Sequence, residues 1–234
     1  MRKSNNNKCG FTLAEVLLVM AIAGVIMAIL IRIVNRVDPD KDKFLFLKSY
    51  NAVEAVVSSS INDGYKYDQN IYNNLETGSQ EELHIDFSDA PLDTAKVVYT
   101  DVNDKGEPVQ KTACPKKAGG DLSCDKELTQ TNALCYYLAE QINTIGPVNC
   151  SGTAAVGEPN FKSTLGVCFF DWDKAQSNGE YTGIIDPSCT VRENGYAVKV
   201  FRRGNVTVPK TSDITTDMQP KAAEWIKNPT KLDD

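Results

Sequence analysis

The sequence predicts an α+β protein in which a long N-terminal helix packs on a small antiparallel β-sheet head with a helical insertion. Three observations support this class. Eighteen of the 21 residues from 11 to 31 are apolar, and a run of that length exceeds any buried strand. A helical period resumes after Pro39. Beyond residue 80, short alternating or compact apolar segments separated by turn residues are typical of strands.

The first 31 residues predict a short basic leader followed by a membrane span. Residues 1–10 carry Arg2, Lys3 and Lys8 and no acidic residue. In a helix, 21 residues extend about 31 Å, which matches the hydrocarbon core of a bilayer. The end of the run has no small-x-small cleavage site, so we expect a retained anchor rather than a secretory signal peptide.

The amphipathic half of the N-terminal helix follows the span. We expect Pro39 to kink or interrupt the helix. Five apolar residues then recur at intervals of 4, 3, 4 and 4, which predicts one helical stripe that needs a surface to pack on; they are Phe46, Tyr50, Val53, Val57 and Ile61. Gly64 is the expected C-terminal cap. We therefore predict a helix over 11–62 and a globular head over 63–234.

The head is predicted to hold several strands and two helices. Its elements are strands at 82–87, 96–102, 165–172, 196–202 and 206–209, and helices at 125–145 and 222–227. The polar residues 103–106 indicate a turn. Gly204-Asn205 between two strands is typical of a hairpin.

The residues Lys8-Cys9-Gly10-Phe11-Thr12-Leu13-Ala14-Glu15-Val16 resemble the N-terminal motif of the type IV pilin and type II secretion pseudopilin family. In that pattern a basic leader ends in Gly, and Phe-Thr-Leu-x-Glu opens the apolar helix. The resemblance implies a pilin-like fold. It also implies that a prepilin peptidase cleaves after Gly10 and methylates the new N-terminus at Phe11. The first proline after the leader, Pro39, comes later than in many pilins.

Glu15 carries the strongest functional prediction, with Thr12 beside it in the assembly motif. A charged side chain inside an apolar span costs at least about 2.5 kcal/mol on insertion, so it marks a functional group with a partner. The resemblance implies that partner: the Phe11 amine of a neighbouring subunit, paired with Glu15 during insertion into a filament. Without the motif, a carboxylate near the lipid headgroups is the alternative.

The cysteines predict disulfides in an exported head. Cys9 would leave with the leader, and six cysteines remain, which allow 15 connectivities. None is spaced C-x-x-C, so zinc and thioredoxin-like roles are disfavoured. If 125–145 is helical, Cys124 and Cys135 lie about 16 Å apart, too far for a bond. The connectivity that we choose closes three short loops: Cys114 with Cys124, Cys135 with Cys150, and Cys168 with Cys189.

One acidic segment resembles a calcium loop. Asp101, Asn103 and Asp104 are its candidate ligands, but Lys105 and Thr112 occupy positions five and twelve, so the EF-hand pattern fails. A turn is the preferred interpretation. We therefore expect no metal site and no cofactor.

Three further features do not predict a site. Asp171, Asp173 and Glu180 are expected in a solvated loop, and His84 on a strand surface. Lys199, Arg202 and Arg203 form a local basic patch, expected on a solvent-facing strand; contact with DNA or an acidic partner is the alternative. The net charge of −6 argues against general nucleic-acid binding.

These observations predict a structural subunit rather than an enzyme. The resemblance implies a single-pass protein of the bacterial inner membrane with its head outside the cytoplasm. Its implied partners are prepilin peptidase, other pilin-like subunits, the assembly platform and the lipid bilayer. A pseudopilus of type II secretion is narrowly preferred. The alternatives are a major or minor type IV pilin for adhesion, motility or DNA uptake, and a membrane-anchored ligand-binding module.

Overall fold

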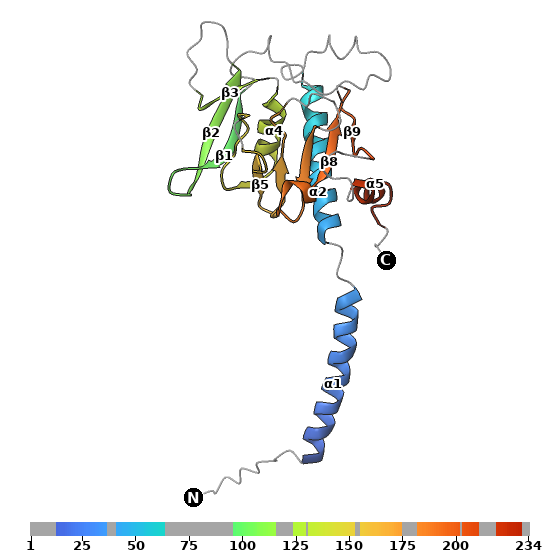
Figure 1. Cartoon of the computed structure of the whole chain (residues 1–234). Helices are drawn as coiled ribbons and strands as arrows, with labels where there is room; N and C mark the ends of the chain where they lie inside the picture. Colours follow the sequence, from blue (N-terminus) through green and yellow to red (C-terminus); the bar gives the residue numbers. More distant parts are fainter. Residues whose placement is uncertain are drawn as a thin grey trace, which may run out of the picture. The chain divides into compact units, whose positions relative to one another are not determined.

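The computed structural model (Figure 1) describes residues 13–36, 41–63, 96–115, 124–129, 131–152, 155–174, 182–201, 203–210 and 219–230. The chain divides into two compact units, Met1–Asp40 and Lys41–Asp234. The first contains helix α1 and the second contains every other helix and strand that the structure describes. The strand predicted at 82–87 and the predicted cap Gly64 lie outside these residues.

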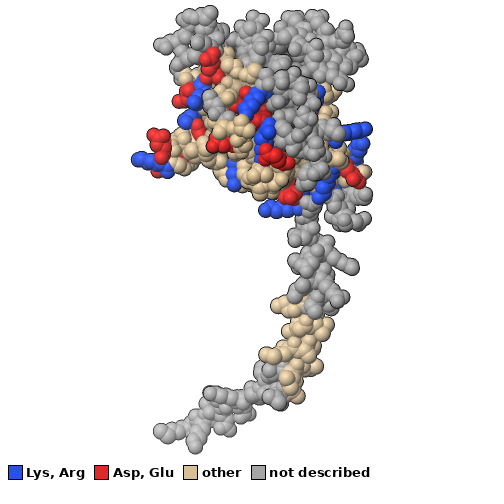
Figure 2. All heavy atoms as spheres, in the orientation of Figure 1, with Lys and Arg blue, Asp and Glu red and all other residues tan. Residues whose placement is uncertain are grey.

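The first unit consists of α1, Leu13–Arg36, which confirms a helix over most of the apolar run. From Leu17 to Met27 every side chain is exposed, and the large apolar ones retain between 51% and 69% of their accessible surface. Figure 2 shows part of α1 as a stretch free of charged side chains. This helix therefore buries no apolar face within its own described unit.

The second unit begins with α2, Lys41–Asn62. The described chain therefore has two helices where the sequence predicted one over 11–62, and the expected interruption at Pro39 falls in the undescribed residues between them. The predicted stripe is confirmed, because Phe46, Tyr50, Val53, Val57 and Ile61 are all buried. Ten residues of α2 are buried in all, so this helix is a central part of the hydrophobic core of the head.

Two sheets complete the head. The first orders as β1-β2-β3, with β1 and β2 antiparallel and β2 and β3 parallel. The second is antiparallel throughout and orders as β4-β5-β6-β7-β8-β9. The strands are β1 Val97–Val102, β2 Pro108–Pro115, β3 Lys126–Leu128, β4 Thr144–Ile145, β5 Phe161–Ser163, β6 Cys168–Phe170, β7 Gly183–Asp186, β8 Tyr196–Val200 and β9 Val206–Thr207.

Aromatic packing holds α2 against the sheet and the C-terminal helix α5, Gln219–Lys227. The Phe46 ring lies 4.8 Å from Tyr196 on β8 and 5.9 Å from Trp225 on α5, measured between ring centroids. Farther along α2, the Tyr50 hydroxyl donates a 2.6 Å hydrogen bond to the Val206 carbonyl. Burial of these rings supplies much of the apolar stabilisation of the head.

The hairpin predicted at Gly204-Asn205 is confirmed between β8 and β9. Gly204 has φ +83°, and a Cβ there would lie 2.5 Å from the Ile61 Cδ1 atom of α2. Glycine satisfies both the left-handed backbone and this close approach. The hairpin thus fixes the far end of α2 on the sheet.

The helix predicted over 125–145 is wrong in its extent. The segment forms β3, a helix α4 over Ala133–Gln141, and β4. The Asn132 side chain accepts a bond from the Thr129 amide and donates one to the Glu127 carbonyl, and these bonds stabilise the turn between β3 and α4. Asp125, at the start of the predicted helix, accepts hydrogen bonds from Thr112 on β2.

The remaining predictions are partly confirmed. Strands at 96–102, 196–202 and 206–209 and the helix at 222–227 are present with shifted ends, and the strand at 165–172 shortens to β6. Strands β2, β5 and β7 were missed. α4 lies between α2 and the β1-β2-β3 sheet (Figure 1) and is the predicted helical insertion. The α+β class holds.

Candidate functional site

The N-terminal motif lies at the start of α1. Gly10, Phe11 and Thr12 lie outside the described residues, and Glu15 falls in the first turn of the helix. Within the part of the chain that the structure describes, no helix has both the length and the apolar character required to cross a membrane. The processing and pairing roles of these four residues, and the span over 11–31, therefore stay predictions.

Three disulfides crosslink the head, with the connectivity chosen from the sequence. Cys114 bonds Cys124, Cys135 bonds Cys150 and Cys168 bonds Cys189, with Cα atoms 6.0, 5.7 and 4.8 Å apart. One argument for that choice was wrong, because Cys124 precedes β3 and does not share a helix with Cys135.

Each disulfide joins different parts of the head. The first joins β2 to Cys124, two residues before β3. The second ties α4 to the loop after β4, and the third ties β6 to the loop after β7. They thus connect both sheets and the inserted helix to their adjoining loops.

Asp101, the first calcium-loop candidate, is instead a buried structural anchor. Its carboxylate lies 2.6 Å from the Lys111 Nζ and accepts hydrogen bonds from the amides of Val102 and Val148. Burial alone would raise the pKa of Asp101, but these bonds hold it below its usual value. The Val148 bond joins the loop after β4 to β1.

Asn103 closes the tight turn between β1 and β2. Its Oδ1 accepts hydrogen bonds from the amides of Lys105 and Glu107. Asp104 is exposed in the same turn. Among the described residues, no group of three or more histidine, cysteine, aspartate or glutamate side chains is placed to hold a metal ion.

The solvated loop predicted around Asp171 and Asp173 is wrong. Both residues are buried. Asp171 pairs with Arg192 at 2.5 Å and with Lys174 at 3.1 Å, and Asp173 accepts a 2.7 Å bond from the Gly152 amide. The two ion pairs offset the cost of burying the Asp171 carboxylate. At Asp173 the Gly152 amide satisfies Oδ2, and the buried Oδ1 has no hydrogen-bond partner among the residues that the structure describes. Glu180 lies outside the described residues.

The basic patch around β8 is only partly described. The Lys199 ammonium lies 5.2 Å from the Phe201 ring centroid, Arg203 is partly buried, and Arg202 and His84 lie outside the described residues. Figure 2 shows lysine, arginine and acidic side chains interspersed over the visible face of the head.

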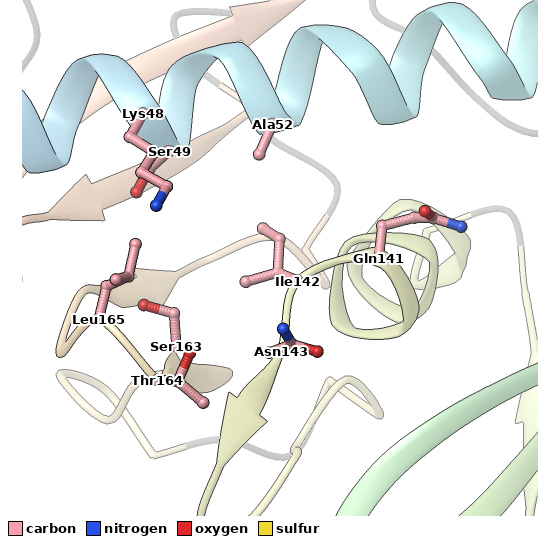
Figure 3. Close-up of a pocket in the computed structure, with 9 residues that line it drawn as sticks. All are labelled: Lys48, Ser49, Ala52, Gln141, Ile142, Asn143, Ser163, Thr164 and Leu165. Atoms are coloured by element: carbon pink, nitrogen blue, oxygen red, sulfur yellow. The ribbon is translucent and has the colours of Figure 1, made fainter.

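A groove of about 400 Å³ opens beside α2. Figure 3 shows Lys48, Ser49 and Ala52 of α2 across an open space from two other segments. These are residues 141–143, at the end of α4, and 163–165, at the end of β5 and in the turn after it. The Ile142 and Leu165 side chains extend toward α2 in this view. Lys48 is the charged residue that lines it, and the groove combines the apolar side chains of Ala52, Ile142 and Leu165 with polar ones.

A second depression of about 600 Å³ adjoins the Cys168–Cys189 disulfide. Apolar residues Ile145, Pro147 and Phe161 line it together with Glu158 and Lys162. Neither depression brings together a nucleophile, a base and an oxyanion donor in a described arrangement that would support catalysis.

Comparison with known proteins decides what the N-terminus is. Residues 5–31 match the family described as the prokaryotic N-terminal methylation motif. The chain carries a prepilin-type motif. This is the cleavage and methylation motif of type IV pilins and pseudopilins, a structural family of subunits. The match confirms the resemblance noted from Gly10 to Glu15 and covers the leader and most of the apolar run. Neither characterised proteins nor solved structures gave a significant match.

Sequence reasoning missed the groove and an exposed aromatic residue on α2. Phe44 on α2 is 59% exposed. The signal was present, because Phe44 is apolar but precedes the buried stripe that begins at Phe46.

Proposed function

We propose that this chain is a structural subunit of a pilin-like filament, anchored in the inner membrane by residues 11–31 and assembled through that helix. The match over residues 5–31 is the observation that supports this role most directly. The exposed apolar side chains from Leu17 to Met27 of α1 also support it, because such a surface is stable in lipid or against other apolar helices rather than in water.

Processing comes first in the proposed assembly. A prepilin peptidase would cleave after Gly10 and methylate the Phe11 amine. The Glu15 carboxylate of one subunit would then pair with the Phe11 amine of the next. Two charges that lipid disfavours would neutralise each other, and the pair would set the axial register.

The head would stand outside the cytoplasm. Its three disulfides support this side of the membrane, because disulfides persist in oxidising compartments. We favour a type II secretion pseudopilus, assembled on an inner-membrane platform. A type IV pilus subunit is the second candidate, and the groove beside α2 keeps a membrane-anchored binding module as a third.

Substitution of Glu15 tests the assembly role. We expect Glu15→Ala and Glu15→Gln to give processed protein that resists carbonate extraction from membranes but enters filaments at least tenfold less than the unchanged chain. Glu15→Asp should retain part of the incorporation because it keeps the carboxylate. Normal filament entry of Glu15→Ala would refute the pairing. Val156→Ala, at an 89% exposed residue of the head, is the matched control.

A further inference from the structure

The six-stranded sheet has an apolar cluster on each of its two faces. Successive side chains of a strand point to opposite faces, and Phe169 and Ile185 belong to the main core, which includes the buried residues of α2. The opposite face carries a smaller outer cluster from β6, β7 and β8, namely Cys168, Phe170, Ile184 and Ala197. Cys189, in the loop 187–191 after β7, packs against this outer cluster. The loop therefore covers part of the sheet face that is directed away from α2.

Hydrogen bonds and a disulfide hold this loop in place. Asp186, at the end of β7, is completely buried. Its carboxylate accepts hydrogen bonds from the amide and hydroxyl of Ser188 and from the Thr190 amide. The disulfide joins Cys189 to Cys168 on β6, 21 residues earlier in the chain. The hydrogen bonds thus connect the loop to β7, and the disulfide connects it across the outer cluster to β6.

The Cys168–Cys189 disulfide is more accessible than the Cys135–Cys150 disulfide. Cys135 and Cys150 are both completely buried. Cys189 is partly exposed, and both Cys168 and Cys189 line the depression of about 600 Å³. Cys189 also has φ +51°, in the left-handed region that residues other than glycine seldom adopt without strain. Exposed or strained disulfides are the ones that exchange most readily with thiols.

We propose that the Cys168–Cys189 disulfide is a site of thiol–disulfide exchange with a dithiol, and that its reduction releases the loop 187–191 from the outer cluster. A thiolate of the dithiol enters the depression and attacks the Cys189 Sγ, which forms a mixed disulfide and expels Cys168 as a thiolate. The second thiolate of the dithiol then attacks the dithiol's own sulfur in the mixed disulfide. The dithiol leaves as a cyclic disulfide, and Cys189 leaves as a thiolate. Two electrons have then passed from the dithiol to the cysteine pair.

The effect of this reduction is local. The main core, with α2 and the buried Cys135–Cys150 disulfide, lies apart from the outer cluster, so the head stays folded when the loop is released. The exchange requires only the folded head and does not depend on filament assembly.

Timed alkylation tests the exchange site. The full-length chain, purified in detergent, is treated with dithiothreitol and quenched with N-ethylmaleimide, and mass spectrometry measures the labelling of each cysteine. We expect Cys168 and Cys189 to be labelled at least about tenfold faster than Cys135 and Cys150 in the folded chain. In guanidinium chloride the two disulfides should react at similar rates, because unfolding removes the difference in access. Equal or slower labelling of Cys168 and Cys189 in the folded chain, or the same difference after unfolding, would overturn the assignment.

Hydrogen exchange tests the release of the loop. In the chain whose Cys168–Cys189 bond alone is reduced, we expect residues 187–191 to exchange at least about fivefold faster, while α2 keeps its protection. The double variant Cys168→Ser with Cys189→Ser should show the same change without dithiothreitol. Cys135→Ser with Cys150→Ser is the matched control and should leave exchange in the loop unchanged. Unchanged exchange of the loop after reduction, or loss of protection throughout α2, would overturn the local release.

Discussion

The two helices at the start of the chain use apolar residues in opposite ways. In α1 every side chain from Leu17 to Met27 is exposed, whereas α2 buries ten residues and packs against α4, α5 and strands β7 and β9. A helix that is apolar on all sides cannot bury its whole surface against a core that contacts only one side, so the remaining apolar surface requires lipid or other helices. An amphipathic helix can bury its single apolar face within its own domain.

This difference explains why function could be inferred from one unit and fold from the other. In the proposed assembly the N-terminal unit depends on partners, and its sequence carries the residues that those partners would recognise. Disulfides, aromatic packing and buried ion pairs stabilise the head, and the residues that form them contribute to its stability. Substitutions in the head should therefore change its stability without changing processing or anchoring, and substitutions in the motif should do the reverse.

The largest effect on the head is expected from Trp225→Ala. Trp225 is 1% exposed, and its ring lies 5.2 Å from Tyr196 and 5.9 Å from Phe46. Loss of a buried tryptophan removes about 3–5 kcal/mol from the free energy of unfolding, measured by urea denaturation of the full chain in detergent. Leu17→Ala in α1 is the control and should change this free energy by less than about 0.5 kcal/mol. An equal loss of unfolding free energy in Trp225→Ala and Leu17→Ala would contradict the difference between the head and α1.

The next effect is expected from removal of the Cys135–Cys150 disulfide by a double substitution to alanine. The bond closes a separation of 15 residues, and loss of such a crosslink costs about 3 kcal/mol. Thermal unfolding checks the loss, and alkylation without reductant should find no free thiol in the unchanged mature head. Cys9→Ala should leave the mature protein identical to wild type, since Cys9 is predicted to leave with the leader.

A smaller, pH-dependent effect is expected from Asp101→Asn. The substitution removes the ion pair with Lys111 and weakens the bond to the Val148 amide, at a cost of about 2 kcal/mol at pH 7. Since folding lowers the pKa of Asp101 from 3.8, its stabilisation is present above that pH and is lost as the pH falls through the lowered pKa.

The difference in unfolding free energy between wild type and Asp101→Asn should therefore narrow below about pH 4. Urea denaturation across a pH series measures it. A constant difference from pH 7 to pH 2 would contradict the ion pair. Asp104→Asn, at an exposed turn residue, is the matched control and should have no effect.

Local patterns in the sequence predicted much of the fold. The stripe from Phe46 to Ile61 follows from helical periodicity, and the hairpin at Gly204 from turn chemistry. Strand β7 was missed because all four of its residues are buried, so it lacks the alternation that identifies half-exposed strands. Strand β3 depends on pairing with β2 and on the Cys114–Cys124 bond, and neither is visible in a local window.

The candidate sites likewise divide into those formed by contiguous residues, which the sequence predicts, and those formed by residues distant in sequence, which it does not. The motif from Gly10 to Glu15 is contiguous, so the sequence displays it directly. The partners of Asp101 and Asp171 come from residues 10 and 21 positions away, Lys111 and Arg192, and the groove joins three separate segments of the chain. Such arrangements arise only when the chain folds, so Asp171 looked solvated although it is buried.

Mass spectrometry of the intact mature protein tests the central claim most directly. If the chain is processed as a pilin-like subunit, its N-terminus is Phe11 carrying one methyl group, and residues 1–10 are absent. An intact leader, cleavage at another position or an unmethylated Phe11 in protein isolated from a strain with active prepilin peptidase would contradict the account.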